Sequence, residues 1–576
     1  MKKFVTVAAA LLVCCAFLMT ASNVMAGARP KMSANQTVAQ GDGPGREVVF
    51  TDLPDLSPVD AASARREVDS PRTPNMTRAQ YEAAKLAALH DTVGSRPQDA
   101  ARFMGAPKNP ATDVAIETPG NFFNILGASY GCAGSFWYPS DMGLAVSNTY
   151  IVQTVNECIT VYNKAGAVVT GPKDLCGIFG LAQGSGNVGC FDPRALYDAQ
   201  AGKFVVITSY QDTSGNAFIL IASASNPTGA WKSHKIARGA GLADYPTLGQ
   251  TAYLNNSTNS VITVCDNFFG ASFYAECLFM PKKGVYGSLG GFPVWSGFTL
   301  GGVIQNTLQP VNSYELSDNP RAQYVINTLN DGGGLCNTGG ETGLLVWAFS
   351  ANTANQSHWS AWFTGCNSTS FYSIPGSADN ASFCSACVET LDNRISAQTF
   401  YSQGEIYPSI DTNNGGTSAV LGWKIHPYLD DNGGGCTSGV NCPNLTSVAI
   451  EQEFCIDCGG GNVVESYFGA QGPDPENDWT MFATFSSSAS GFSESPGTYY
   501  TSNRVSWLTP FHDAGIFACQ ANNSWSGRWG DYSAVAPDDP GSNAKNIPAV
   551  FGSGMYVNAA NSWGTCISGV HPQDGP

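Results

Sequence analysis

The chain has 576 residues, of which 43% are hydrophobic, 11% aromatic and only 13% charged. Such a sequence is too apolar to be disordered, and its 64 glycines indicate many turns between short strands. The net charge of −17 argues against nucleic acid as a partner, because phosphates require a basic surface, and against an anionic membrane surface.

Residues 1–26 have the pattern of a secretory signal peptide. Two lysines precede the apolar run Val5–Met19, and the small residues of Val24–Ala26 form a cleavage site. We expect the mature chain to begin at Gly27. No later apolar run reaches the roughly 18 residues that span a bilayer. The sequence therefore predicts a secreted protein, extracellular or periplasmic, without a membrane span.

Residues 27–115 differ from the rest, being rich in Ala, Pro, Asp, Arg and Ser and poor in aromatic residues. One helix is predicted here, because Thr77 and Gln80 resemble a capping box and good helix formers follow to Leu89. We expect a poorly structured or partly helical N-terminal leader. A flexible leader, an arm on the outside of the core and a removable pro-segment all stay open.

Residues 116–576 contain a repeated unit in which a short polar or aromatic motif is followed by apolar, alternating runs. The candidate units begin near Asp141, Asp192, Tyr245, Ser313, Tyr407, Tyr467 and Tyr532. Repetition without a helical period favours an all-β β-propeller of seven blades, with six also possible, since radial repetition protects sheet edges. A row of sandwich domains is the alternative.

The cysteines predict a disulfide-stapled domain. Without Cys14 and Cys15, which lie in the signal peptide, 16 of the 18 remain, an even number in an oxidising compartment. The simplest pairings join sequence neighbours: Cys176 with Cys190, Cys265 with Cys277 and Cys436 with Cys442. Two CxxC pairs, Cys384–Cys387 and Cys455–Cys458, allow a zinc site as an alternative to disulfides.

A set of motifs carries a family resemblance. Arg528–Ala534 reads RWGDYSA, and further blocks are Pro139–Asp141, Asp192–Asp198, Asn226–Trp231 and Asp244–Gly249. Together they resemble blocks of secreted bacterial β-propeller proteins that are loosely grouped as sialidase-like. The resemblance covers roughly residues 120–570 and implies a secreted propeller without implying a particular reaction.

Sialidase chemistry itself finds little support. The Asp-box repeat of true sialidases is missing from the sequence. Four arginines are candidates for binding a substrate carboxylate by their position in the units: Arg194, Arg321, Arg394 and Arg528. A tyrosine nucleophile beside a carboxylate would have to be Tyr401 or Tyr407 with Glu405.

The acidic residues that open the units are the main candidate site. The first strand of each propeller blade lines the axis, so Asp141, Asp192, Asp244 and Asp531 can converge at one mouth. Such a carboxylate ring with Arg528 suits Ca²⁺ or a hydroxyl-rich sugar. Alternatively, each Asp caps a turn or bonds to the backbone of the neighbouring unit.

These considerations give a defined set of site residues. The catalytic candidates are Asp141, Glu405, Arg528 and Asp531, and the ligand-binding candidates are Asp192, Asp244, Trp529 and Tyr532. Packing between blades is the alternative for the two aromatic side chains. The six histidines show no metal-ligand spacing, so no metal site is predicted among them, and Ca²⁺ is the cation that suits the acidic residues.

Three functional classes remain. The first is a ligand-binding or scaffold protein at the cell surface or outside the cell, whose partner is a glycan or a cell-surface component. The alternative is a glycan-active enzyme, a glycoside hydrolase or polysaccharide lyase, that uses axial carboxylates and an Arg. The third is a structural or assembly role.

Overall fold

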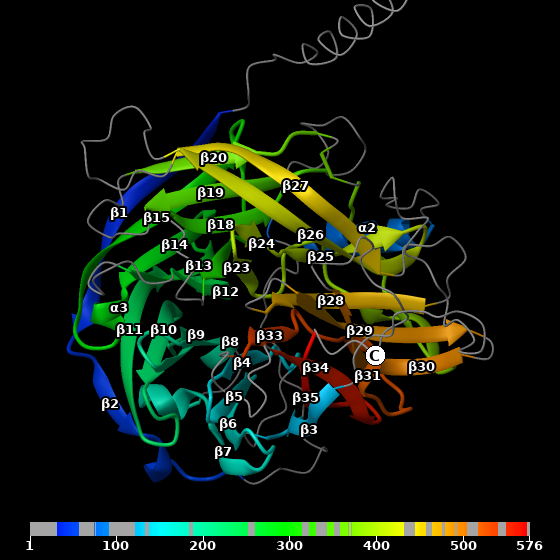
Figure 1. The fold of residues 1–576 in the computed structure, drawn as a ribbon, viewed down its shortest axis with the longest axis horizontal. Coiled ribbons are helices and arrows are strands. Elements are labelled where there is room, and N and C mark those ends of the chain that lie inside the picture. Colours follow the sequence, from blue (N-terminus) through cyan, green and yellow to red (C-terminus); the bar gives the residue numbers. More distant parts are fainter. Residues whose placement is uncertain are drawn as a thin grey trace, which may run out of the picture.

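The structure is a computed structural model in which strands dominate (Figure 1). It describes residues 31–56, 74, 76–90, 121–132, 138–183, 188–251, 260–313, 322–329, 342–350, 358–366, 368–369, 371–430, 444–456, 464–474, 478–489, 492–503, 516–538 and 549–572. The predicted all-β class is confirmed. The predicted signal peptide lies outside these residues.

The first three strand groups follow one another along the chain, each as an antiparallel sheet. The first consists of β4 (Gly143–Val146), β5 (Tyr150–Val155), β6 (Cys158–Asn163) and β7 (Val168–Asp174), followed by the 3-10 helix η3 (Cys176–Phe179). The second consists of β8 (Gly189–Asp198), β9 (Lys203–Gln211), β10 (Asn216–Ala224) and β11 (Ala230–Ala240). The third consists of β12 (Leu242–Gln250), β13 (Val261–Phe269), β14 (Phe273–Pro281), the short helix α3 (Lys282–Val285), β15 (Leu289–Leu300) and β16 (Val303–Ile304).

The next two groups are joined to the third by backbone hydrogen bonds between their inner strands. The fourth consists of β17 (Gln309–Ser313), β18 (Ala322–Thr328), β19 (Leu344–Ser350) and β20 (Trp359–Phe363). The fifth consists of β23 (Thr399–Ser402), β24 (Glu405–Ile406), β25 (Ser409–Asn414), β26 (Thr417–Asp430) and β27 (Asn444–Ile456). Strand β17 runs parallel to both β12 and β23, so these inner strands start at the same end of the molecule.

The last two groups return the chain to its starting point. The sixth consists of β28 (Val464–Pro473), β29 (Trp479–Ala489), β30 (Phe492–Asn503) and β31 (Ile516–Cys519). The seventh consists of β33 (Ala534–Pro537), β34 (Val550–Ala559), β35 (Ser562–Val570) and, paired antiparallel to β35, β3 (Asn121–Ser129). A small additional sheet contains β21 (Ala378–Asn380), β22 (Cys384–Glu389) and β32 (Gly527–Arg528).

The inner strands of the groups surround a common axis, an arrangement of the propeller type (Figure 1). Strand β8 contacts β4 and β12, and β28 contacts β25 and β33, while β33 also contacts β4. Six of the seven predicted unit starts lie near the beginning of such strands, whereas Ser313 is the last residue of β17. A row of separate sandwich domains is excluded, because the first and last groups touch.

The hydrophobic core lies between neighbouring groups and not within a single layer. Val152 of the first group packs with Val206 of the second, and Ile207 on the other side of that sheet packs with Ile262 of the third. Alternate side chains of one strand thus face different neighbours, as the two-residue period of a strand requires. Burial on both faces explains the nearly continuous apolar runs in strands such as β9, β13 and β19.

The leader contributes more structure than the sequence predicted. Helix α2 (Arg78–His90) is present as expected, and Gln80 accepts a hydrogen bond from the backbone N–H of Thr77. Two strands were not expected: β1 (Met32–Gly43) pairs with β15 and β2 (Arg46–Val49) pairs with β11, before the 3-10 helix η1 (Phe50–Asp52). Part of the leader is therefore an arm that adds edge strands to the second and third groups. Strand β1 is mainly polar and has no apolar alternation that would predict a strand. Backbone hydrogen bonds to the neighbouring strand supply most of its pairing.

Disulfides staple the groups. The predicted pairs Cys176–Cys190 and Cys265–Cys277 are confirmed, and the Cys436–Cys442 prediction lies outside the described residues. The structure also joins Cys132 to Cys158, Cys384 to Cys387 and Cys519 to Cys566. The zinc alternative is therefore wrong for Cys384 and Cys387. Disulfides of this kind fit an extracellular protein.

Candidate functional site

Three aspartates from three strand groups meet at the axis. Asp141 precedes β4, Asp192 lies in β8 and Asp531 precedes β33, and each offers a carboxylate oxygen within 4.8 Å of the others. None of the three side chains is more than 5% exposed. The structure thus brings together three of the four aspartates that the sequence predicted to converge, at the end of the molecule where the inner strands begin.

Local backbone geometry positions these carboxylates. Asp141 and Asp192 have positive φ angles of 39° and 54°, a region that Asp and Asn tolerate better than most residues. At Asp192 the pairing of β8 with β9 shifts register, so a bulge turns the side chain toward the axis. Tyr245 repeats this arrangement in β12, with a φ of 54° and a register shift beside Asp244.

The same aspartates also hold neighbouring groups together. The backbone N–H of Tyr245 donates to Asp192 Oδ2 over 3.2 Å, and that of Asp531 donates to Asp141 Oδ1 over 2.9 Å. Asp411 accepts in the same way from the N–H of Phe468, which also has a positive φ. The alternative in which an Asp bonds to the backbone of a neighbouring unit is therefore correct for Asp141 and Asp192. The same two residues also converge at the axis.

Burial and mutual repulsion shift the titration of the axial carboxyls. Burial, with the nearby carboxylates of Asp531 and Asp192, raises the pKa of Asp141 well above its ordinary value. Burial and the charge of Asp531 raise the pKa of Asp192 to about 6. Burial, together with Asp192 and Asp531, raises the pKa of Asp244 to about 8. Carboxyls with pKa values on either side of neutrality can supply a proton donor and an acceptor to one site.

Arginines accompany the acids. Arg528 forms an ion pair with Asp531, with Nε 3.2 Å from Oδ1 and a second contact between Nη2 and Oδ2. Arg394 binds Asp392 through two nitrogen–oxygen contacts of 2.6 and 2.7 Å. Its guanidinium lies 4.5 Å from the ring centre of Tyr245.

Arg194 is the third guanidinium. It lies 3.1 Å from the ring centre of Tyr532 and donates to the carbonyl oxygens of Pro246 and Ser396 over 3.2 and 3.0 Å. Its Nη2 is buried and makes no hydrogen bond. Three of the four arginines considered from the sequence therefore surround the axial aspartates, and the fourth, Arg321, lies outside the described residues.

The side chains of the two aromatic candidates are packed in the interior and form no exposed surface for a ligand. Trp529 and Tyr532 are both 1% exposed. The indole of Trp529 donates to Thr484 Oγ1 over 3.2 Å, and the hydroxyl of Tyr532 donates to the carbonyl oxygen of Pro193 over 2.9 Å. Their satisfied polar atoms and buried rings fit the packing alternative, not a sugar platform.

Glu405 does not join the axial aspartates. It lies in β24, where its Oε1 is 2.8 Å from Nδ1 of His426, and it forms a second group with His426 and Glu451. Its two possible nucleophile partners are engaged elsewhere, since Tyr401 stacks on Tyr324 and Tyr407 packs in the core between the fifth and sixth groups. Glu405 is thus separated from the other catalytic candidates.

Helix α2 lies against the same end of the molecule. The Lys85 ammonium donates to the carbonyl oxygen of Pro375 and to Thr390 Oγ1, both over 2.8 Å. Burial lowers the pKa of Lys85 to about 8, opposed by the carboxylates of Glu389, Asp392 and Asp411. Asp411 accepts from the backbone N–H of Phe468 in inner strand β28, so the helix packs near the first half of that strand. Neither Lys85 nor Asp392 was predicted as a site residue.

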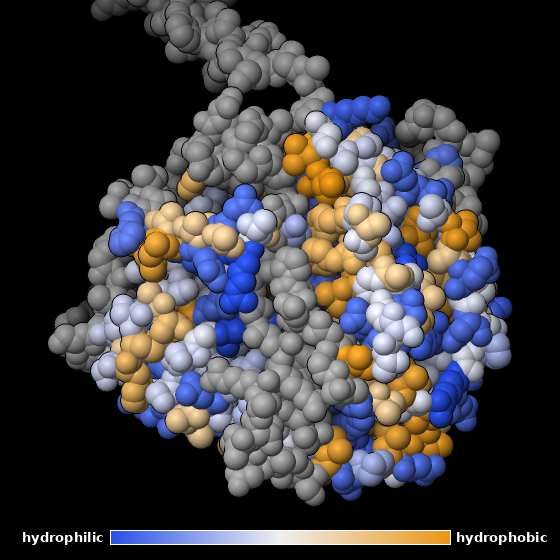
Figure 2. Space-filling model, turned by 180° about the vertical axis from the view of Figure 1, so that it is seen from behind, coloured by the Kyte–Doolittle hydropathy of each residue, from blue (hydrophilic) through white to orange (hydrophobic). Residues whose placement is uncertain are grey.

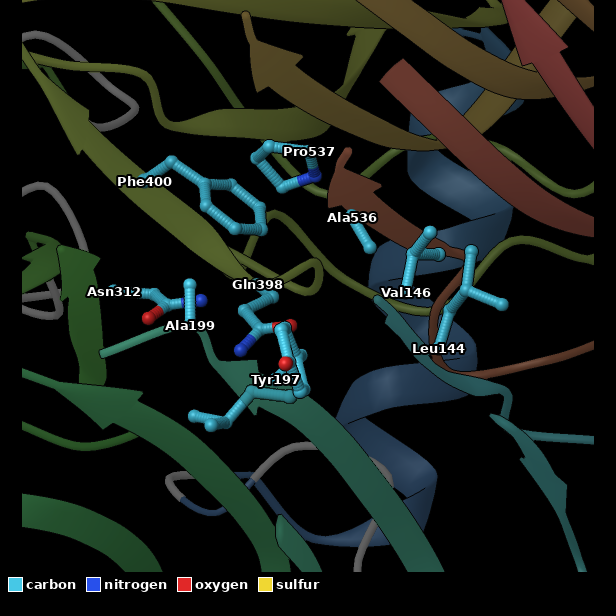
Figure 3. Close-up of a pocket in the computed structure, with 10 residues that line it drawn as sticks. Leu144, Val146, Tyr197, Ala199, Asn312, Gln398, Phe400, Ala536 and Pro537 are labelled. Carbon is cyan, nitrogen blue, oxygen red and sulfur yellow. The ribbon is translucent and has the colours of Figure 1, made fainter. Parts of the chain in front are cut away.

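The opposite end of the axis is nearly filled. Figure 3 shows side chains from several inner strands turned toward one narrow space. This cavity has a volume of about 20 Å³, enough for one water molecule, and is lined mainly by apolar residues such as Leu144, Leu196, Phe400 and Ala536. At roughly 3.3 Å per residue, it lies about 15 Å along the strands from the axial carboxylates. The axis is therefore no open pore at this level.

Sequence reasoning missed the residues that support the axial aspartates. Asn156, in the turn after β5, donates its amide to Asp141 Oδ2 and accepts from the backbone N–H of Asp192. Nothing in the linear sequence marks it, because its partners lie 15 and 36 residues away. The structure shows that Asn156 belongs to a recurring set, since Asp192, Asn267 and Asp411 likewise accept the N–H of a left-handed residue in a following unit.

Comparison with known proteins does not assign a family. No protein-family model matches the chain, and no curated protein matches it. A solved structure of exo-β-1,3-galactanase from Phanerochaete chrysosporium has 11% identity and a TM-score of 0.28, covering 78% of this chain and 97% of that chain. An apocarotenoid oxygenase from Synechocystis has 11% identity and a TM-score of 0.31, covering 66% and 74%. At these scores the similarities support no functional argument.

Among the described residues, no helix is long and apolar enough to cross a membrane.

Proposed function

We propose that this protein is a secreted, seven-bladed β-propeller that acts on carbohydrate at the axial mouth, as a glycan-active enzyme. One observation carries the proposal: Asp192 of the axial group and Asp244, which precedes the Tyr245 that bonds to Asp192, are buried carboxyls with pKa values near 6 and 8 beside arginines. Glycoside cleavage requires a protonated acid and an ionised carboxylate in one site. Asp244 would donate the proton and Asp192 would accept one.

The remaining residues suit substrate positioning. The ion-paired Asp531 and Arg528 can hold sugar hydroxyls through charge-assisted hydrogen bonds, and Arg194 has one nitrogen left to donate. The axial acids are almost fully buried, so access requires a local opening at the mouth. Helix α2 is the element whose movement would provide it, because Lys85 bonds next to Asp392 and Arg394.

The binding or scaffold interpretation is less well supported by the surface. The exposed large aromatic side chains of the described residues are Phe122, Phe383 and Tyr428, which come from three separate elements. Figure 2 shows apolar residues in several separate areas of one face, interspersed with polar ones. A scaffold that binds through one aromatic patch would gather them.

A screen for polysaccharide degradation with the purified mature chain tests the enzyme proposal. We expect reducing ends or unsaturated products from at least one glycan, and a loss of at least 100-fold in rate for Asp192→Asn and Asp244→Asn. Asp411→Asn is the matched control, since Asp411 is buried and caps a turn but lies outside the axial group. Glycan binding without cleavage in wild type would favour the scaffold class instead.

A second candidate, Ca²⁺ binding, is favoured by the 4.8 Å grouping of three carboxylates, which is the oxygen-only donor set that this cation prefers. A Ca²⁺ ion between these carboxylates would neutralise the part of their mutual repulsion that the nearby arginines do not offset. Calcium should then raise the melting temperature of wild type and not of Asp141→Asn, as measured by calorimetry with and without chelator.

A further inference from the structure

Three strands of the fifth group place a histidine and two glutamates together at a partly exposed point of their sheet. Glu405 of β24, His426 of β26 and Glu451 of β27 offer ligand atoms that all lie within 4.8 Å of one another. Strands β24, β26 and β27 are consecutive neighbours in one sheet. No pair of these residues shows ligand spacing in the sequence, because the strand pairing alone brings them together.

Each side chain is directed to this point by the sheet. Ile406 pairs with Ile425 in antiparallel register, which sets Glu405 opposite His426. Between Lys424 and Ile425 the register of β26 with β27 shifts, and Glu451 is the additional residue. Bulges re-aim a side chain in this way.

The imidazole is held in place before any ligand binds. The ring of Tyr428 packs on that of His426 with centroids 4.4 Å apart. Gly404 packs on the same imidazole, since a Cβ there would come within 3.2 Å of His426 Cε1. A fixed imidazole reduces the entropy lost when it becomes a ligand.

One glutamate oxygen lacks a partner. Glu405 Oε1 contacts Nδ1 of His426 at 2.8 Å, but Oε2 is buried and makes no hydrogen bond, and the side chain is only 8% exposed. Leaving a buried carboxylate oxygen unsatisfied is unfavourable, because its desolvation is not offset by a hydrogen bond. A bound cation would remove that cost.

We propose that Glu405, His426 and Glu451 form a binding site for a divalent first-row cation of the Zn²⁺ type. One imidazole with two carboxylates suits Zn²⁺, whereas Ca²⁺ and Mg²⁺ prefer oxygen ligands alone. Ligand atoms around tetrahedral zinc lie roughly 3.4 Å apart, so a small rotation of the surface side chain Glu451 completes the site. Its loose contact with Lys424, 3.7 Å between Nζ and Oε2, would be exchanged for the metal.

The site is independent of the axial aspartates. Strand β23 runs parallel to β17 from the axial mouth, so the turn that leads into Glu405 lies at the far end of that strand. Three protein ligands leave a coordination position open, and the side chains of His426 and Glu451 are 30% and 39% exposed. Water or a small anionic ligand can therefore reach the cation.

Metal titration of the purified, chelator-treated mature chain tests this proposal. We expect one equivalent of Co²⁺ to give visible d–d absorption, and Zn²⁺ to displace it. Glu451→Gln and Glu405→Gln should each weaken Zn²⁺ binding at least tenfold. The matched control is His90→Ala at the exposed end of α2, which should bind as wild type does.

The outcomes are decisive in both directions. Glu451 lies on the surface, so its variant should fold even where Glu405→Gln does not, and circular dichroism checks this. Absence of stoichiometric binding, binding of Ca²⁺ in preference to Zn²⁺, or unchanged affinity in Glu451→Gln would each overturn the proposal. Glycan cleavage is unaffected by these variants under the axial proposal, so the two can fail separately.

Discussion

Asp192 shows how one side chain serves both the architecture and the candidate chemistry. Its Oδ2 accepts the backbone N–H of Tyr245 from the next group, and its carboxylate faces those of Asp141 and Asp531. Three carboxylates this close cannot all be ionised without a compensating cation or proton. The axial aspartates therefore carry a cost in free energy that depends on pH.

At the residue scale, Asp244 should make stability depend on pH. Its pKa is about 8 in the folded protein against 3.8 in the unfolded chain, so the folded state holds the proton more tightly. The resulting stabilisation is fully present below pH 3.8 and is lost as pH rises through about 8. We expect the free energy of unfolding to fall by up to about 1.4 kcal/mol per pH unit over this range.

The Asp244→Asn variant should show a flatter profile, because the amide does not titrate. Denaturant unfolding at pH 5 and pH 8.5 measures the difference, with the exposed Asp52→Asn as a control that keeps the wild-type slope. If the free energy of unfolding changes equally with pH in wild type and in Asp244→Asn, other titrating groups determine the pH dependence.

At the element scale, the buried residues Tyr81 and Lys85 of helix α2 make polar contacts with the segment around Glu389 and Thr390. Tyr81 donates to Glu389 Oε1 over 3.0 Å, and Lys85 is surrounded by Glu389, Asp392 and Asp411. Lys85→Glu would place a fourth carboxylate among these three. We expect the helix to detach, with thermolysin cleavage within residues 78–90 at least about tenfold faster, since opening governs cleavage.

Arg78→Gln is the control for this experiment, because Arg78 lies on the exposed face of the same helix. Mass spectrometry locates the cut. Protection of α2 in Lys85→Glu equal to that in wild type would mean that apolar contacts alone hold it.

Prediction from sequence succeeded where periodicity and turn chemistry coincide. The motifs at Asp141, Asp192 and Tyr245 mark inner strands, and the apolar runs that follow them mark the neighbouring strands, which are buried on both faces. The strands of the arm were missed because β1 is polar and half exposed, so only the edge of β15 selects its conformation. A strand whose partner lies far away in the sequence cannot be predicted from a short stretch of residues around it.

The candidate site could also be predicted only in part from the sequence. The convergence of Asp141, Asp192 and Asp531 followed from the idea of an axis, because all three open inner strands. Glu405 was grouped with them wrongly. Its neighbours are decided by the pairing of β24 with β26 and by the bulge at Glu451, and register is a property of the folded sheet.

At the scale of the whole molecule, the disulfides should contribute according to the length of chain that they close. Cys519–Cys566 spans 47 residues and links the sixth group to the seventh, whereas Cys384–Cys387 spans three. Loop-closure entropy predicts a loss of about 4 kcal/mol for the first and about 2 kcal/mol for the second. Thermal unfolding of the two double Cys→Ser variants measures this, and a larger effect at Cys384–Cys387 would contradict it.

The pairing of β3 with β35 has a consequence for biosynthesis. A ribosome that has completed the first six groups still holds an open assembly, because the partner of Asn121–Ser129 is the strand Ser562–Val570 near the end of the chain. The seventh group can therefore close only after Ser562–Val570 has been synthesised. Until then the edge of β3 lacks its partner in that group, and partly assembled chains with such unpaired edges are prone to misassembly.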